Sequence, residues 1–211
     1  MEGHHATPVT WQRTLGTTVG ALALTSTVVL VPLSSAADRP TVLHTYTTFE
    51  HAKLAPGLVV RASARGSCWT LSEVESRPYT WRCLHGNYIH DPCFSATPTS
   101  SLVACPDAPW SSQVLLLRLT KPLPHWHTYK PPIPASAWPW GIITIAGKHC
   151  ISAASAATGE INGKQITYVC QGGGLLVGFT HRTTATWTIW YASSFTSKHL
   201  TLVTIADAWR Q

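Results

Sequence analysis

The chain has 211 residues, of which 45% are hydrophobic and only 11% are charged. This composition excludes an intrinsically disordered chain, because such chains combine low hydrophobicity with high charge. It also supplies enough apolar material for a packed core. The net charge of +6 comes from scattered residues rather than from a run of Lys or Arg, and no nucleic-acid-binding motif accompanies it.

Residues 1–37 are predicted to be an export signal peptide that is removed from the mature protein. Arg13 is followed by an uncharged stretch with an apolar middle and with small residues at 34–37. These are the parts of a secretory signal. The alternative is an uncleaved membrane anchor, since the apolar stretch is just long enough to span a bilayer. We expect cleavage, secretion and no stable membrane insertion, because Thr and Ser dilute the stretch, and because Pro32 and the small residues after it suit a signal peptidase.

Residues 38–57 are predicted to be a flexible lead-in that is rich in Thr and His. A disulfide-stapled β domain is predicted to follow from residue 58 to residue 211, beginning with a short strand at 58–63. The region 66–105 holds four of the six cysteines. We expect this region to be rich in loops.

Strands are predicted on both sides of a proline-rich connection, and the half of the domain after this connection is predicted to be one strand after another. Residues 113–119 form the clearest strand, because an apolar run of this length that ends before a proline is too short for a helix. Six prolines make 121–139 a stiff extended connection between the two halves. Turn residues separate the strands expected after it, at 140–146, 149–154, 165–170, 175–179, 185–191 and 199–205. This pattern predicts an all-β fold, a small antiparallel sandwich or barrel.

All six cysteines follow the predicted signal peptide, and an even number of cysteines in an exported chain predicts disulfides. Six cysteines allow 15 pairings, which the sequence does not separate. We predict that nearest neighbours pair: Cys68–Cys83, Cys93–Cys105 and Cys150–Cys170. A cysteine-ligated metal site is not expected, because no C-x₂-C pair occurs.

The third predicted pair conflicts with a turn signal. Asn162-Gly163 is typical of a two-residue β-hairpin turn. Such a turn places Cys150 opposite Leu175 rather than opposite Cys170. Either the turn is wider than two residues, or a bulge intervenes, or the third pair is wrong.

A spaced pattern of cysteine and tryptophan runs through the domain. It consists of Gly66-Ser67-Cys68-Trp69, Trp81-Arg82-Cys83, Asp91-Pro92-Cys93-Phe94, Cys105-Pro106 and Tyr168-x-Cys170. Over residues 58–209 the chain resembles a family of uncharacterised secreted proteins from actinobacteria and related soil bacteria. The resemblance implies export and a disulfide framework, and it carries over no catalytic residue. The Tyr168-x-Cys170 segment and the glycines at 172–174 are also similar to small periplasmic lysozyme inhibitors, which are β-barrels.

Aromatic residues in and beside the proline-rich connection form the predicted binding surface: His125, Trp126, His127, Tyr129, Trp138 and Trp140. An exposed aromatic ring can stack on a sugar or anchor a partner protein, and the alternative is simple packing of the connection. Histidines at i and i+2 could hold a metal, but no third ligand follows, so neither a metal nor a cofactor is expected. Three other tryptophans flank or face the cysteine strands and are expected in the core: Trp69, Trp81 and Trp187.

These observations favour a non-catalytic extracellular module that binds an unknown glycan or protein of the cell envelope. An extracellular hydrolase of glycan or cell-wall polymer is the alternative, although residues 38–211 contain only eight acidic residues that could form a carboxylate pair. A lysozyme-inhibitor-like protein is a second alternative. A cleft with an acid and a histidine within hydrogen-bond reach would favour the enzyme, whereas exposed tryptophan would favour binding.

Overall fold

The computed structural model describes residues 39–75, 78–124, 138–153 and 159–210. The predicted signal peptide lies outside these residues. Every regular element among them is a β-strand, so the all-β prediction is confirmed. None of the described segments forms a helix with the length and hydrophobicity that crossing a bilayer requires.

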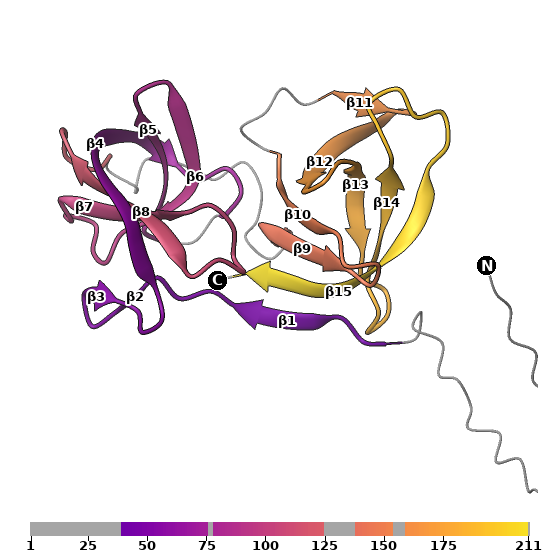
Figure 1. The fold of residues 1–211 in the computed structure, drawn as a ribbon, viewed down its shortest axis with the longest axis horizontal. Helices are drawn as coiled ribbons and strands as arrows, with labels where there is room; N and C mark the ends of the chain where they lie inside the picture. The colour runs from indigo at the N-terminus through magenta and orange to yellow at the C-terminus, as the bar shows by residue number, and fades with distance from the viewer. Residues whose placement is uncertain (1–38, 76–77, 125–137, 154–158, 211) are drawn as a thin grey trace, which may run out of the picture. The chain divides into compact units, whose positions relative to one another are not determined.

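Five strands close into a first barrel around a buried core (Figure 1). They are β4 (Val59–Leu71), β5 (Thr80–His85), β6 (Tyr88–Phe94), β7 (Leu102–Pro106) and β8 (Gln113–Leu119). Each strand pairs antiparallel with the next, and β8 returns to pair in parallel with β4. A meander with an odd number of strands closes in this way because its first and last strands run in the same direction.

The prediction that region 66–105 is rich in loops is wrong, because this region contains about half of β4, all of β5 and β6, and all but the last residue of β7. The strand signal is hidden for a physical reason. Cysteines occupy the inward positions that Val or Ile usually fill in a strand. In addition, Pro92 lies inside β6, whereas proline normally marks the end or the edge of a strand.

Six strands close a second barrel. They are β9 (Gly141–Thr144), β10 (His149–Ser152), β12 (Lys164–Cys170), β13 (Leu175–His181), β14 (Thr188–Ala192) and β15 (Thr201–Arg210). Successive strands pair antiparallel, and β15 pairs with β9 to complete the ring. The strands predicted after residue 139 are therefore found, with shifted bounds.

Three short strands precede the first barrel: β1 (Val42–Thr45), β2 (Phe49–Glu50) and β3 (Lys53–Leu54). They correct the predicted lead-in, because the β structure begins at residue 42 and not at residue 58. β1 pairs in parallel with β15, and β2 and β3 form a hairpin. After β1, Tyr46 is buried edge-on against Trp140, with ring centroids 5.2 Å apart.

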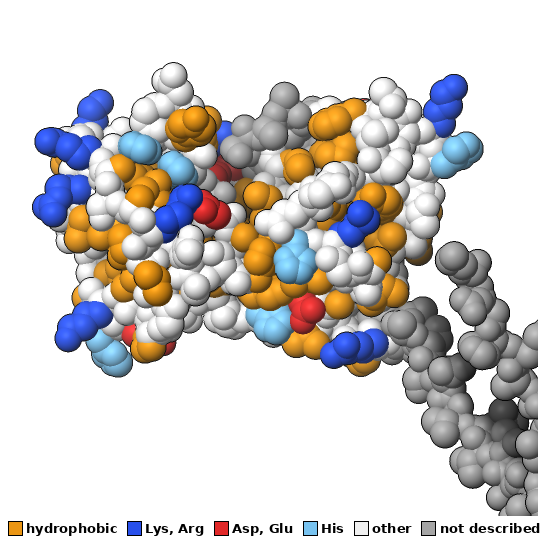
Figure 2. Space-filling view, in the orientation of Figure 1, with side chains coloured by type: hydrophobic (Ala, Val, Ile, Leu, Met, Phe, Trp, Pro, Cys, Tyr) orange, Lys and Arg blue, Asp and Glu red, His pale blue; other side chains and the backbone are white. Residues whose placement is uncertain are grey.

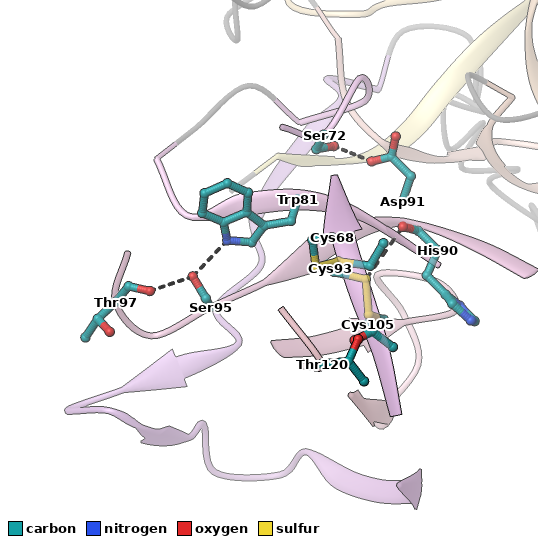
Figure 3. The surroundings of a disulfide bond; sticks show 12 residues. Cys68, Ser72, Trp81, His90, Asp91, Cys93, Ser95, Thr97, Cys105 and Thr120 are labelled. Carbon is teal, nitrogen blue, oxygen red and sulfur yellow. Dashed lines mark hydrogen bonds between the residues drawn. A yellow bond between two sulfur atoms is a disulfide. The ribbon is translucent and has the colours of Figure 1, made fainter. Parts of the chain in front are cut away.

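The three predicted disulfides are all present: Cys68–Cys83, Cys93–Cys105 and Cys150–Cys170. Two cross-link neighbouring strands of the first barrel, and the third joins β10 to β12 in the second barrel. In the part of the chain that the structure describes, no cysteine is free. Figure 3 shows two of the first barrel's cysteines, Cys93 and Cys105, close to the buried Trp81.

The two-residue turn at Asn162-Gly163 and the third disulfide are both present, so the two predictions do not exclude each other. Asn162 and Gly163 have φ values of 51° and 68°, and they join β11 (Glu160–Ile161) to β12 in a two-residue hairpin. Ser152 pairs with Tyr168, and Glu160 pairs with Gln165. The chain thus advances eight residues (160 − 152) where β12 uses three (168 − 165). Five extra residues leave the ladder between β10 and β11, which restores the pairing of the two cysteines.

Replacing Cys150 and Cys170 together with alanine should lower the free energy of unfolding by about 3 kcal/mol. The reason is that the cross-link spans 20 residues and restricts the unfolded chain. Denaturant unfolding of both proteins measures the difference. A loss below about 1 kcal/mol would show that the link adds little to a barrel whose strands already pair.

Candidate functional site

The binding surface predicted from the sequence is described only in part. Four of its residues lie outside the described residues: His125, Trp126, His127 and Tyr129. Trp138 is half-buried against Phe179, with ring centroids 4.6 Å apart. It also lines a cavity of about 20 Å³ together with Trp187 and Arg182. That volume holds about one water molecule, so the cavity is too small for a sugar or a side chain of a partner.

Trp140 does not belong to a binding surface, which corrects the prediction. It is only 2% exposed and packs in an aromatic cluster with Tyr46 and Phe94. This cluster includes residues from both barrels, and the half-buried Trp209 packs against it. Trp140 therefore stabilises the contact between the barrels.

Trp69, which the sequence analysis places in the core, is instead exposed on the outside of the first barrel. It is 46% exposed. The register of β4 against β5 shifts between Cys68 and Thr70, so Trp69 is the extra residue of a β-bulge. The signal that could have found it is alternation: a residue beside an inward-facing cysteine points outward.

The exposed indole is supported by a guanidinium group. Arg82 Cζ lies 5.6 Å from the centroid of the Trp69 ring, within the range of a cation–π interaction. Arg82 is itself ion-paired with Glu73, and its Nε lies 3.9 Å from Asp91 Oδ2. Because two carboxylates hold the guanidinium, the indole rests on a fixed support and needs little ordering to meet a ligand.

Asp91 anchors this support from inside the protein. Its side chain is fully buried. It accepts hydrogen bonds from the Ser72 hydroxyl and from the Glu73 backbone N–H, the latter at 3.1 Å, and Figure 3 shows Ser72 and Asp91 pointing toward each other. Burial raises the pKa of Asp91 from 3.8 to about 6, although the two hydrogen bonds and Arg82 act in the opposite direction.

The raised pKa of Asp91 predicts a pH dependence of stability. Between about pH 4 and pH 6, Asp91 is protonated in the folded protein but ionised in the unfolded chain. Stability from this group therefore falls as the pH rises through that window, by roughly 3 kcal/mol for a pKa change from 3.8 to about 6. Unfolding of the wild type and Asp91→Asn at pH 4 and pH 7 isolates the effect, since only the wild type should lose this stability.

Apolar side chains extend the exposed surface around Trp69. Leu84 and Ile89 are exposed register partners on β5 and β6, and Ser67 lies opposite Leu84 on β4. We call these residues the Trp69 face: Ser67, Trp69, Arg82, Leu84 and Ile89. The face combines one large ring, two aliphatic side chains and two groups that can form hydrogen bonds.

A histidine–carboxylate pair is the feature that the hydrolase alternative requires. His44 Nε2 lies 2.7 Å from Asp207 Oδ1, and the His44 ring stacks on Trp209 at 4.6 Å. The pair joins β1 to β15 and thus fastens an edge strand. Within the described ranges, His44 has no hydrogen bond to a Ser, Thr or Cys side chain that could act as a nucleophile.

Metal-ligand spacing occurs once among the described residues, in the sulfurs of Cys83, Cys93 and Cys105. All three sulfurs are in disulfides. A thiolate, which is the form that binds metal, is therefore not present at this cluster in the oxidised protein.

No known protein family, curated protein or solved structure matches this chain. The assignment of a site consequently depends on its own geometry and chemistry.

Proposed function

We propose that this protein is a non-catalytic extracellular module that binds a glycan through the Trp69 face. The observation that carries the proposal is the exposed indole of Trp69, which rests on a guanidinium group held between Glu73 and Asp91. A core tryptophan would be buried, and an incidental surface tryptophan would need no such support. An exposed, pre-positioned aromatic ring is suited to stacking on the apolar face of a sugar.

The composition of the Trp69 face favours a glycan over a protein partner. Protein interfaces have an apolar centre and cover about 800 Å² on each side. The Trp69 face has three apolar side chains, and the polar Ser67 and the charged Arg82 lie among them. Hydroxyl and guanidinium groups beside one ring match a sugar, which presents hydroxyl groups around an apolar face.

The disulfides support the compartment in this proposal. Three intramolecular disulfides are typical of oxidising environments outside the cytosol. Glycans of the cell envelope and its surroundings are the abundant polymers there. Secretion through the predicted signal at residues 1–37 is part of the proposal.

The proposal is tested by retention on insoluble glycans. Protein with its three disulfides formed is incubated with purified peptidoglycan, chitin, cellulose and starch, and the protein left in solution is measured. We expect depletion by at least one polymer, reversed by soluble oligosaccharides of that polymer. Retention on none of them would contradict glycan binding, and the appearance of new reducing ends would contradict a non-catalytic module.

A further inference from the structure

A groove of about 380 Å³ lies on the outer surface of the first barrel, beside β4. It is lined by Ser63, Ala64, Arg65, Leu102, Leu116 and Arg118. Figure 2 shows Lys and Arg side chains along the edge of the molecule where Figure 1 places the first barrel. None of the described residues that line the groove is acidic, so the groove presents only positive charge.

The two arginines of the groove lie side by side. Arg65 on β4 and Arg118 on β8 are register partners on adjacent parallel strands, and both side chains are exposed. Neighbouring strands are about 4.8 Å apart. Like charges in this arrangement destabilise a sheet, and an anion between the two guanidinium groups would remove that repulsion.

A third arginine of the first barrel, Arg61 on β4, shows what an ordinary pairing looks like. Arg61 is ion-paired with Asp107, with Nη2 and Oδ1 3.0 Å apart. Among the residues that the structure describes, neither Arg65 nor Arg118 has such a carboxylate within 4.0 Å. These two guanidinium groups are thus available for an acidic ligand, to which arginine binds through two parallel hydrogen bonds.

The groove and the Trp69 face are continuous along β4. Burial alternates from Arg65 to Trp69: Arg65, Ser67 and Trp69 point outward, and Gly66 and Cys68 are buried. Four residues of extended strand span about 13 Å. A single extended polymer can therefore meet both the indole and the arginine pair.

We propose that the ligand of the Trp69 face is an anionic glycan, whose acidic groups are bound by Arg65 and Arg118 while one sugar ring stacks on Trp69. The inference rests on the proposed glycan-binding function and names its ligand class. Carboxylates of uronic acids and phosphates of phosphate-linked glycans share the required chemistry. The charge of the pair provides selection against neutral polymers, and the indole provides stacking that does not depend on charge.

The test compares glycans that differ only in charge. Binding is measured to polygalacturonate and alginate, to their methyl-esterified neutral forms, and to a phosphate-linked wall glycan. The variants are Arg65→Gln and Arg118→Gln, with Arg61→Gln as a control that removes the same charge from the same barrel. We expect each of the first two to weaken binding to the acidic glycan about tenfold, and the control to stay within about twofold because Asp107 already neutralises Arg61.

The outcomes separate the inference from the function on which it rests. Equal binding to charged and esterified glycans, with sensitivity to Trp69, would overturn the anionic specificity and leave glycan binding intact. Binding to no glycan would overturn both. Binding to vesicles that contain phosphatidylglycerol, without binding to any glycan, would assign the arginine pair to a lipid surface and would also overturn the inference. Preference for the phosphate-linked polymer over the uronates would support it and identify the acidic group.

Discussion

Replacing Trp81 with alanine should lower the free energy of unfolding by about 4 kcal/mol. Trp81 is fully buried in the core of the first barrel, where its strand pairs on one side with β4 and on the other with β6. The deletion leaves a cavity among strands that the disulfides hold together, so the barrel cannot collapse to fill it. Denaturant unfolding followed by circular dichroism measures the loss.

The milder substitution Trp81→Phe separates packing from hydrogen bonding. The indole N–H of Trp81 donates to Ser95 Oγ at 2.8 Å, and Ser95 Oγ donates to the Thr97 carbonyl at 2.9 Å (Figure 3). With phenylalanine the Ser95 hydroxyl keeps its acceptor, and much of the ring volume remains. The expected cost is about 1–2 kcal/mol. If Trp81→Ala cost no more than Trp81→Phe, the ring would not be supporting the barrel core.

Replacing Trp69 with alanine should weaken glycan binding at least about 30-fold, which corresponds to the loss of about 2 kcal/mol typical of a central aromatic contact. The free energy of unfolding should change by less than about 1 kcal/mol, because truncation of an exposed side chain leaves no cavity. Affinity for the glycan that retains the wild type and denaturant unfolding together distinguish the two effects.

Two variants control for general effects of removing an aromatic side chain. Phe195 is 67% exposed and lies between β14 and β15 in the second barrel, so Phe195→Ala should leave the affinity unchanged. Trp69→Tyr keeps a ring at the site and should restore most of the binding. If Phe195→Ala weakened binding as much as Trp69→Ala did, the ligand would not be recognised by the Trp69 face.

The second barrel could be predicted from the sequence because its signals are local. Period-two alternation and glycine-rich turns mark its strands, and the Asn162-Gly163 hairpin forms as the dipeptide predicts. The pairing of Cys150 with Cys170 required one fact that no local pattern contains, the five extra residues between β10 and β11. In the first barrel, β8 and the start of β4 coincide with predicted strands, whereas β5, β6 and β7 were missed because cysteines and prolines occupy positions that usually carry Val or Ile.

The candidate site was harder to predict, because it depends on pairing between distant segments. Trp69 was assigned to the core by its neighbour Cys68, whereas alternation along β4 directs it outward. Arg65 and Arg118 are 53 residues apart in sequence (118 − 65) and become neighbours only because β8 closes the barrel onto β4. When the way the barrel closes is not known, the sequence shows these two residues only as scattered charges.

The most direct test of the account is a glycan titration followed by NMR of the tryptophan side chains, because each indole N–H gives its own signal. Residues 38–211 contain nine tryptophans, and single Trp→Phe variants assign the signals. Saturating acidic glycan should shift the Trp69 indole signal and leave that of the buried Trp140 unchanged. A titration in which the Trp69 signal stays fixed while another indole shifts would contradict the account.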